Sequence, residues 1–245
     1  MLTVGSLFSG IGGFELGLER TGGFKTAWQC EKDEFCLKVL AKHWPDVKRF
    51  TDIKEMGIEE NIPYVDVICG GFPCQDISCA GKGAGIHAER SGLWWEMLRV
   101  IRMVRPRYVL VENVAALLNR GLDEVLGSLA KSGYDAEWQV ISANFVGSQQ
   151  LRERLYLVAY SAVSGTICKS ARDERPQGDI SVRGRVFGGN RKMAGGQGSK
   201  AQRYTEPWAT EPNIRRVADG IPNQLDRLRA LGNAIVPQCA EYVGR

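Results

Sequence analysis

The alternation of short apolar runs with helical patterns, from the N-terminus to about residue 160, most constrains the fold of this chain. The apolar runs are typical of buried strands and lie at residues 3–8, 27–30, 65–69, 108–111, 137–142 and 155–159. Strands that alternate with helices in this way form βαβ units, in which the strands are parallel and helices cover both faces of the sheet. The sequence therefore predicts an α/β fold built on a parallel, doubly wound sheet.

Boundary signals place helices between the runs. Asp33 is suited to cap a helix that must end before Pro45, and Ser91 is placed to cap another. In the second of these helices, Trp94 and Trp95 stand at helical spacing with the apolar residues that follow. Both tryptophans are therefore predicted to lie in the core.

The periodicity disappears from residue 161 to about residue 202, where glycines and basic residues dominate. Between Ser161 and Tyr204 there are nine Lys or Arg and three Asp or Glu, a local charge of +6 in a chain whose net charge is +4. Regular pattern returns after this basic segment, and Pro237 is suited to the first turn of a short last helix. We therefore expect a main domain at 1–160, the basic segment at 161–205, and a C-terminal segment at 206–245 that returns to the main domain.

Cysteine and histidine usage excludes several classes of protein. The chain has seven cysteines and two histidines and no C-x-x-C pair, so we expect no metal site, and the odd cysteine count argues against a disulfide framework. No apolar stretch approaches the ~20 residues that cross a membrane. We expect a soluble, cytoplasmic protein with reduced thiols and no membrane partner.

A glycine-rich turn follows the first predicted strand, in the run Phe8-Ser9-Gly10-Ile11-Gly12-Gly13. Glycines at such a turn let a ligand approach the backbone. Glu15 stands where a dinucleotide-binding turn has its third glycine, and a carboxylate there would repel a pyrophosphate. Glu31 ends the second strand, in the place from which an acidic side chain binds ribose hydroxyls, and Asp52 with Ile53 is placed to hold an adenine. This order favours S-adenosyl-L-methionine as the cofactor.

A cysteine and a carboxyl group are predicted at one edge of the sheet. Cys74, between Pro73 and Gln75, follows one buried strand, and Glu112 ends another. Open α/β sheets carry their ligand sites at the carboxyl ends of the strands. A nucleophile with an acid partner is therefore expected there.

Five ordered motifs together resemble the DNA cytosine-5 methyltransferases of the phage or prophage type. They are Phe8-Ser9-Gly10-Ile11-Gly12, Pro73-Cys74-Gln75, Glu112-Asn113-Val114, Gln150-Leu151-Arg152-Glu153-Arg154 and Gly232-Asn233-Ala234-Ile235. The resemblance implies a Rossmann-like S-adenosylmethionine-dependent methyltransferase fold with a small recognition insertion. It also implies methyl transfer to C5 of cytosine in a specific double-stranded DNA sequence, through a covalent bond from Cys74 to C6 of a flipped-out base.

The resemblance assigns roles to individual residues. Catalytic roles fall to Cys74, Glu112, Arg152 and Arg154. The cofactor-binding residues are Phe8, Ser9, Gly10, Ile11, Gly12, Gly13, Glu31, Lys32, Asp52, Ile53, Pro73, Leu93, Asn233, Ala234 and Ile235. Contacts to DNA are expected from Gln75, Ser78 and Arg90, and from Arg183 and Arg185 of the basic segment, because DNA enzymes need phosphate contacts and groove readers.

Two other functions stay open at this point. A transfer RNA cytosine-5 methyltransferase would carry the same motifs. This alternative stays open because the recognition segment is shorter than is usual for the DNA-reading members of the family. A catalytically silent DNA-binding or cofactor-sensing relative is disfavoured by the intact pair of Cys74 and Glu112. We expect a monomer, and whether a restriction endonuclease accompanies it is left open.

Overall fold

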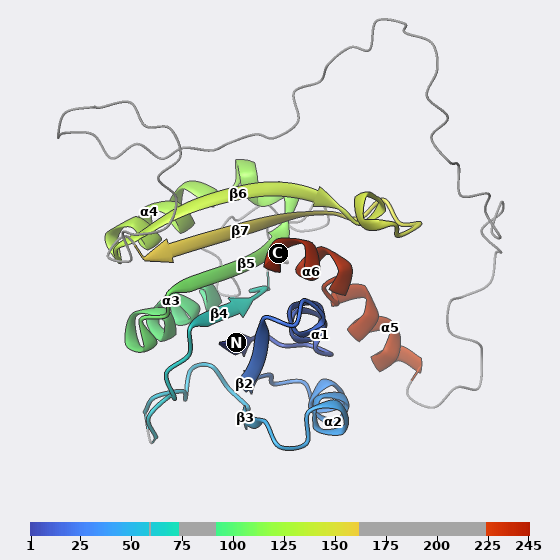
Figure 1. The fold of residues 1–245 in the computed structure, drawn as a ribbon, viewed down its shortest axis with the longest axis horizontal. Helices are drawn as coiled ribbons and strands as arrows, with labels where there is room; N and C mark the ends of the chain where they lie inside the picture. The colour runs from blue at the N-terminus through green and yellow to red at the C-terminus, as the bar shows by residue number, and fades with distance from the viewer. Residues whose placement is uncertain (59, 74–91, 162–223) are drawn as a thin grey trace, which may run out of the picture.

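The computed structural model describes residues 1–58, 60–73, 92–161 and 224–245. These residues form one seven-stranded sheet with helices on both faces (Figure 1). Within the described ranges, no helix is both long and apolar enough to cross a membrane.

The strand order of the sheet is β3-β2-β1-β4-β5-β7-β6. The strands are β1 (Leu2–Leu7), β2 (Phe24–Cys30), β3 (Lys48–Phe50), β4 (Val67–Gly70), β5 (Tyr108–Val114), β6 (Tyr134–Ser142) and β7 (Glu153–Ser161). From β3 to β5 every neighbouring pair is parallel. The predicted α/β fold is confirmed, and β3 adds a three-residue edge strand that the sequence pattern does not predict.

The prediction of a wholly parallel sheet is wrong at β7. Strand β7 runs antiparallel to both β5 and β6. A parallel neighbour needs a crossover of a dozen or more residues, usually through a helix. The chain between β6 and β7 holds only the short 3₁₀ helix η3 (Ala143–Val146), so β7 returns directly alongside β6. Alternating apolar residues identify both strands but not their direction.

The described residues contain six α-helices. They are α1 (Gly13–Arg20), α2 (Glu34–His43), α3 (Leu93–Val104), α4 (Leu122–Lys131), α5 (Gln224–Asn233) and α6 (Pro237–Gly244). Helices α3 and α4 contribute to one hydrophobic core, and α1 and α6 to the core on the other face. Asp33 caps α2 as predicted, because its carboxylate accepts the N–H of Cys36 at 3.0 Å.

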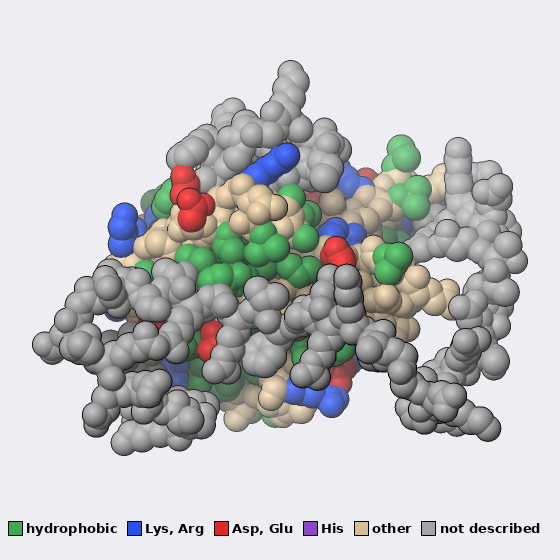
Figure 2. Space-filling view, turned by 90° about the horizontal axis from the view of Figure 1, so that it is seen from above, with side chains coloured by type: hydrophobic (Ala, Val, Ile, Leu, Met, Phe, Trp, Pro, Cys, Tyr) green, Lys and Arg blue, Asp and Glu red, His purple; other side chains and the backbone are tan. Residues whose placement is uncertain are grey.

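Strand β6 forms one edge of the sheet and carries apolar residues that extend the core to this edge. Trp138 and Val140 on this strand are half-buried and pack against the core that α3 and α4 cover. Viewed from the β6 side, Figure 2 shows a band of apolar side chains with charged side chains around it.

The prediction for the two tryptophans of α3 is half correct. Trp94 is fully buried, and its indole N–H donates to Ser128 at 3.1 Å. Trp95 is 44% exposed, because consecutive residues of a helix point about 100° apart and α3 buries a single face. The N-cap position of α3 belongs to Gly92, while the expected cap Ser91 lies outside the described residues.

Helices α1 and α6 approach each other closely through glycines. A β-carbon on Gly17 would lie 2.3 Å from the carbonyl oxygen of Pro237, and one on Gly13 would lie 2.5 Å from that of Ile235. Real β-carbons do not come so near to backbone atoms, so both positions require glycine. This contact brings the C-terminal segment against the start of α1.

We expect Gly17→Ala to destabilise the protein by about 1–3 kcal/mol, because the new methyl group forces α6 away from α1. The matched control is Gly127→Ala in α4, where an added β-carbon meets nothing within 4 Å. That change should stabilise the protein by about 0.5–1 kcal/mol through helix propensity. Urea unfolding of both variants measures the difference, and equal effects would contradict the close contact.

Candidate active site

The turn that leaves β1 is built from unusual backbone conformations. Phe8, Gly10 and Gly12 have positive φ values of 54°, 56° and 87°, a region that glycine enters without strain. The N–H of Gly12 donates to the carbonyl of Ser9 at 2.9 Å and closes the turn. Ile11 and Gly13 complete it and lead into α1. The predicted glycine turn is therefore present, with the backbone open to a ligand at Gly10, where an added β-carbon would meet nothing.

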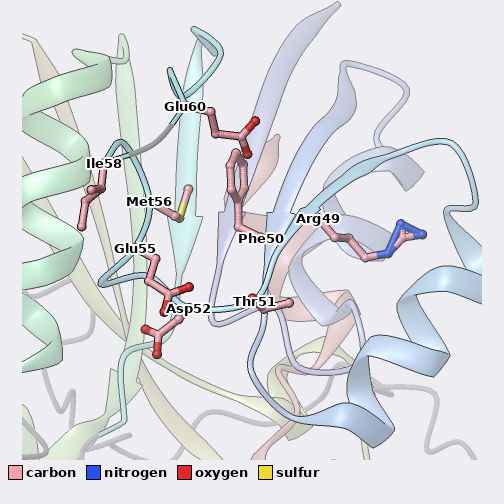
Figure 3. A pocket seen from close by; sticks show the side chains of 8 residues that line it. All are labelled: Arg49, Phe50, Thr51, Asp52, Glu55, Met56, Ile58 and Glu60. Carbon is pink, nitrogen blue, oxygen red and sulfur yellow. The ribbon is translucent and has the colours of Figure 1, made fainter.

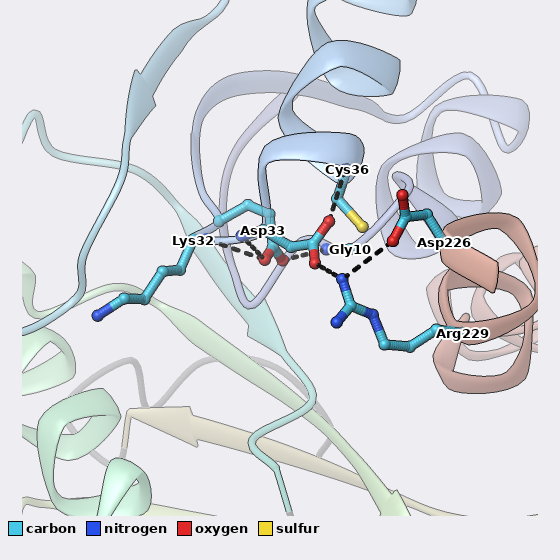
Figure 4. A network of polar contacts seen from close by, with 7 residues as sticks. Gly10, Lys32, Asp33, Cys36, Asp226 and Arg229 are labelled. Atoms are coloured by element: carbon cyan, nitrogen blue, oxygen red, sulfur yellow. Dashed lines mark hydrogen bonds and ion pairs between the residues drawn. The ribbon is translucent and has the colours of Figure 1, made fainter. Parts of the chain in front are cut away.

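The carboxylate of Glu31 binds this turn to the start of α2. It accepts the N–H of Gly10 at 2.7 Å and the N–H groups of Lys32 and Asp33 at 2.8 Å each. Figure 4 shows how Gly10, Lys32 and Asp33 converge there. A carboxylate has about four acceptor sites. Three are used by the backbone, which leaves one for a ligand hydroxyl.

Asp52 lies next to Lys32, with 2.7 Å between the Lys32 amine and a carboxylate oxygen. The hydrogen bond from Lys32 holds the pKa of Asp52 below its usual value. Asp52 also lines a pocket of about 640 Å³ beside β3, in which its side chain lies near that of Glu55 (Figure 3). Ile53, in contrast, is 4% exposed and belongs to the core. Of the two residues predicted to hold an adenine, Asp52 thus borders open space and the Ile53 side chain does not.

Glu15 does not face the ligand side of the turn, contrary to expectation. Its side chain is fully buried and accepts the amide N–H of Gln29 at 3.1 Å. Burial raises its pKa. The Glu15 side chain is thus enclosed by the protein, and the expectation that its carboxylate stands beside a bound pyrophosphate does not agree with this position.

Glu112 is the carboxyl group at the carboxyl end of β5. It is 8% exposed, and Arg154 on β7 lies 3.1 Å from one of its oxygens. Burial raises the pKa of Glu112 to about 7, although Arg154 and Arg152 act to lower it. Near neutral pH the group is therefore present in both protonation states, so it can donate or accept a proton at a substrate.

Gly71 brings the chain that leads to Cys74 into contact with Glu112. A β-carbon on Gly71 would lie 2.8 Å from a carboxylate oxygen of Glu112. The side-chain amide of Asn113 donates to the carbonyl of Phe72 at 3.2 Å and holds the same stretch. Gly71 is not among the predicted site residues, although the double glycine at the end of β4 is a signal for such an approach.

The catalytic cysteine of the prediction follows this stretch in the sequence. Pro73 is described, while Cys74, Gln75, Ser78 and Arg90 lie outside the described residues. So do Arg183 and Arg185 of the basic segment. The structure thus brings together Glu112, Arg154 and the approach to Cys74.

Arg152 joins the start of β7 to the C-terminal segment. Its two terminal nitrogens donate to the carbonyls of Gly232 and Ala234 at 2.9 and 3.0 Å. Its Nε–H is buried and has no partner among the described residues. Arg152 is therefore anchored on backbone carbonyls next to the Gly232–Ile235 motif, and Arg154 is the arginine in contact with Glu112.

The C-terminal segment lies against the start of α1 and the end of β4. Ile235 lies against Gly13 through its backbone and within 3.8 Å of the position of a β-carbon on Gly71. Asn233 ends α5, and Arg229 of that helix pairs with Asp33 (Figure 4). Leu93 begins α3 and packs half-buried against the core. The predicted residues of the first and last motifs are thus neighbours in space.

Comparison with known proteins identifies relatives of one kind. Residues 2–184 match the family model of C-5 cytosine-specific DNA methylase. The chain is 39% identical over 166 residues to Type II methyltransferase M2.BsuMI of Bacillus subtilis, covering 64% of this chain and 42% of the relative. It is 35% identical over 166 residues to Type II methyltransferase M.Bsp6I of a Bacillus strain, covering 65% and 52%. The chain thus spans about half the length of these curated relatives.

Solved structures support the Rossmann-like fold. A DNA modification methyltransferase encoded within an E. coli prophage has a TM-score of 0.56 at 24% identity, over 67% of this chain and 48% of that one. The Entamoeba histolytica methyltransferase EhMeth has a TM-score of 0.55 at 20% identity, over 65% and 53%.

Glu112 should make the stability of the protein depend on pH. Its folded pKa of about 7 lies above the ordinary value of 4.5, so its contribution is fully present below pH 4.5 and is lost as the pH rises through 7. At ~1.4 kcal/mol per pH unit, the loss is at most roughly 3–4 kcal/mol. Glu112→Gln should therefore gain stability over the wild type across this window in urea unfolding. The exposed change Glu153→Gln should keep the wild-type fall, and an E112Q advantage that does not vary with pH would contradict the assignment.

Proposed function

The chain belongs to the C-5 cytosine-specific DNA methylase family, and on this premise we propose that it transfers a methyl group from S-adenosyl-L-methionine to C5 of cytosine in double-stranded DNA. The observation that carries the proposal is the buried Glu112 carboxyl group beside Arg154 and beside the chain entering Cys74. Glu112 is an acid with a pKa of about 7, and the predicted nucleophile Cys74 follows Gly71 by three residues in the sequence.

The chemistry explains why these residue types are needed. Cytosine C5 is too weak a nucleophile to take a methyl group until something adds at C6, and the Cys74 thiolate is suited to that addition. Glu112 would hold a proton at N3 of the ring while sulfur adds, and Arg154 would keep the carboxyl group in place. After C5 is methylated, loss of the C5 proton returns electrons to the ring and breaks the bond between C6 and sulfur.

The residues present fit S-adenosyl-L-methionine, which when bound supplies the methyl group as a sulfonium. Glu31 has one acceptor site left for a ribose hydroxyl, and the turn at Gly10 is open. Asp52 borders a pocket beside β3. Each of these groups would bind or orient the cofactor, while Ile235 and Gly13 would close the site from the C-terminal side.

We further propose that the target base is flipped out of the duplex, because Cys74 cannot reach C6 of a stacked base. The basic segment, with its +6 charge, would supply contacts to the phosphates and bases.

Deletion of the basic segment should make the slope of log DNA affinity against log salt concentration shallower, because fewer phosphates are neutralised. An unchanged slope would argue against this role.

The nucleophile can be tested by trapping. DNA containing 5-fluorocytosine cannot lose the C5 substituent, so in the presence of cofactor it should form a denaturation-resistant adduct with the protein. Cys74→Ala should abolish the adduct, while Cys79→Ala should retain it. Transfer RNA carrying the same base analogue is tested in parallel. If only the RNA forms an adduct, the substrate is RNA and the proposal of a DNA substrate is refuted. If C74A still forms an adduct, Cys74 is not the nucleophile.

Glu31 can be tested by calorimetry with S-adenosyl-L-methionine. Glu31→Ala should weaken binding by roughly 1.5–3 kcal/mol, the range for a lost hydrogen bond to a charged group. The control is Glu34→Ala, three residues further on and exposed in the first turn of α2. Equal affinities of the two folded variants would show that Glu31 is not a cofactor contact.

A further inference from the structure

Two fully buried polar atoms beneath the glycine turn have no hydrogen-bond partner among the described residues. They are Oε2 of Glu15, on the first turn of α1, and Oε1 of Gln29, on β2. The other two polar atoms of these side chains are joined, since Gln29 Nε2 donates to Glu15 Oε1 at 3.1 Å. Both residues are 0% exposed. Buried acceptors without a donor are costly and call for an explanation.

A single proton on the Glu15 carboxyl group would give both atoms a hydrogen-bond partner. A carboxylate can only accept, but a protonated carboxyl group also donates, and Gln29 Oε1 can accept. An acid and an amide can thus pair in both directions, with the amide N–H bonded to one carboxyl oxygen and the carboxyl O–H bonded to the amide oxygen. No other arrangement of these two side chains satisfies all four atoms.

The surroundings favour the neutral acid. Hydrogen bonds from the Glu15 backbone and from the Ser6, Gln29 and Ser9 side chains act to lower the pKa of Glu15, against the effect of burial. The titratable group facing Glu15 from β4 is Cys69, which burial keeps in the thiol form by raising its pKa. The N-terminus of α1 favours a negative charge, but this effect is small beside the cost of a charge fully removed from water. Burial is accordingly the largest influence on Glu15 and raises its pKa.

We propose that Glu15 is a neutral acid that pairs with Gln29 in both directions and thereby positions the glycine turn for the cofactor. The pair joins the start of α1 to β2 two residues before Glu31. Ser9, within the turn, donates to Ser6 at 3.0 Å and through its backbone to Cys30 at 3.1 Å. Glu15 is therefore a positioning residue, and this inference rests on the proposed cofactor site.

Replacement by glutamine tests the pair, because a glutamine side chain at this position can donate and accept as the neutral acid does. Glu15→Gln should keep the affinity for S-adenosyl-L-methionine within about twofold of the wild type, whereas the isosteric apolar change Glu15→Leu should lower it at least tenfold, a loss of about 1.4 kcal/mol. The exchanged pair Glu15→Gln with Gln29→Glu, which keeps one acid and one amide, should also bind within about twofold of the wild type. A tenfold loss in E15Q would overturn the proposal. Failure of the wild type to bind would instead refute the proposed function.

The protonation state has its own measurement, which does not depend on cofactor binding or on folding of the leucine variant. The infrared difference spectrum of wild type minus E15Q at pH 7 should contain the carbonyl band of a protonated carboxyl group. Glu112 also has a raised pKa, so the same spectrum recorded with Glu112→Gln identifies the part of the signal that comes from Glu112. Because the folded pKa of Glu15 lies above 4.5, E15Q should also gain stability over the wild type as the pH rises above 4.5. Absence of the band together with a constant stability difference would mean an ionised Glu15 and would overturn the proposal.

Discussion

The close contact of α1 with α6 is the constraint on which the candidate site depends. Gly13 and Gly17 have no side chain, so the backbone around Ile235 and Pro237 can lie directly on α1. Residues that follow the undescribed range 162–223 thereby reach the turn after β1. Without this approach the first and last motifs would not meet, and the cofactor side of the site would lack one wall. The contact is local in space but spans almost the whole chain.

Three glutamates near this contact differ in chemistry because their surroundings differ. Glu31 accepts three backbone N–H groups and is an acceptor by construction. Glu112 is buried beside an arginine, and the opposing effects leave its pKa at about 7. Glu15 is fully buried, and burial raises its pKa although hydrogen bonds from its backbone and from Ser6, Gln29 and Ser9 act to lower it. One residue type can thus accept backbone hydrogen bonds, have a pKa near neutrality or lie fully buried, according to what desolvates it and what bonds to it.

Features set by neighbours in sequence could be predicted, and features set across the fold could not. The cap at Asp33 and the first turn at Pro237 follow from one residue and its local preference. The direction of β7 is set by its short connection to β6, and the apolar pattern of a strand does not indicate the direction in which the strand runs. For Glu15, the sequence reveals the position in the turn but not the packing of the helix that follows, so the side chain is wrongly expected to face a ligand. The contact of Gly71 with Glu112 likewise depends on the adjacency of β4 and β5.

Arg152 shows why the site cannot be divided into a cofactor part and a base part. Its guanidinium binds the carbonyls of Gly232 and Ala234, some 80 residues away, and its charge also acts to lower the pKa of Glu112. Leaving a half-buried guanidinium without acceptors is unfavourable, so Arg152, which influences the acid, also contributes to holding the C-terminal segment. The position of the segment and the protonation of Glu112 therefore depend on one set of contacts, formed only when β7, α1 and the end of the chain are assembled.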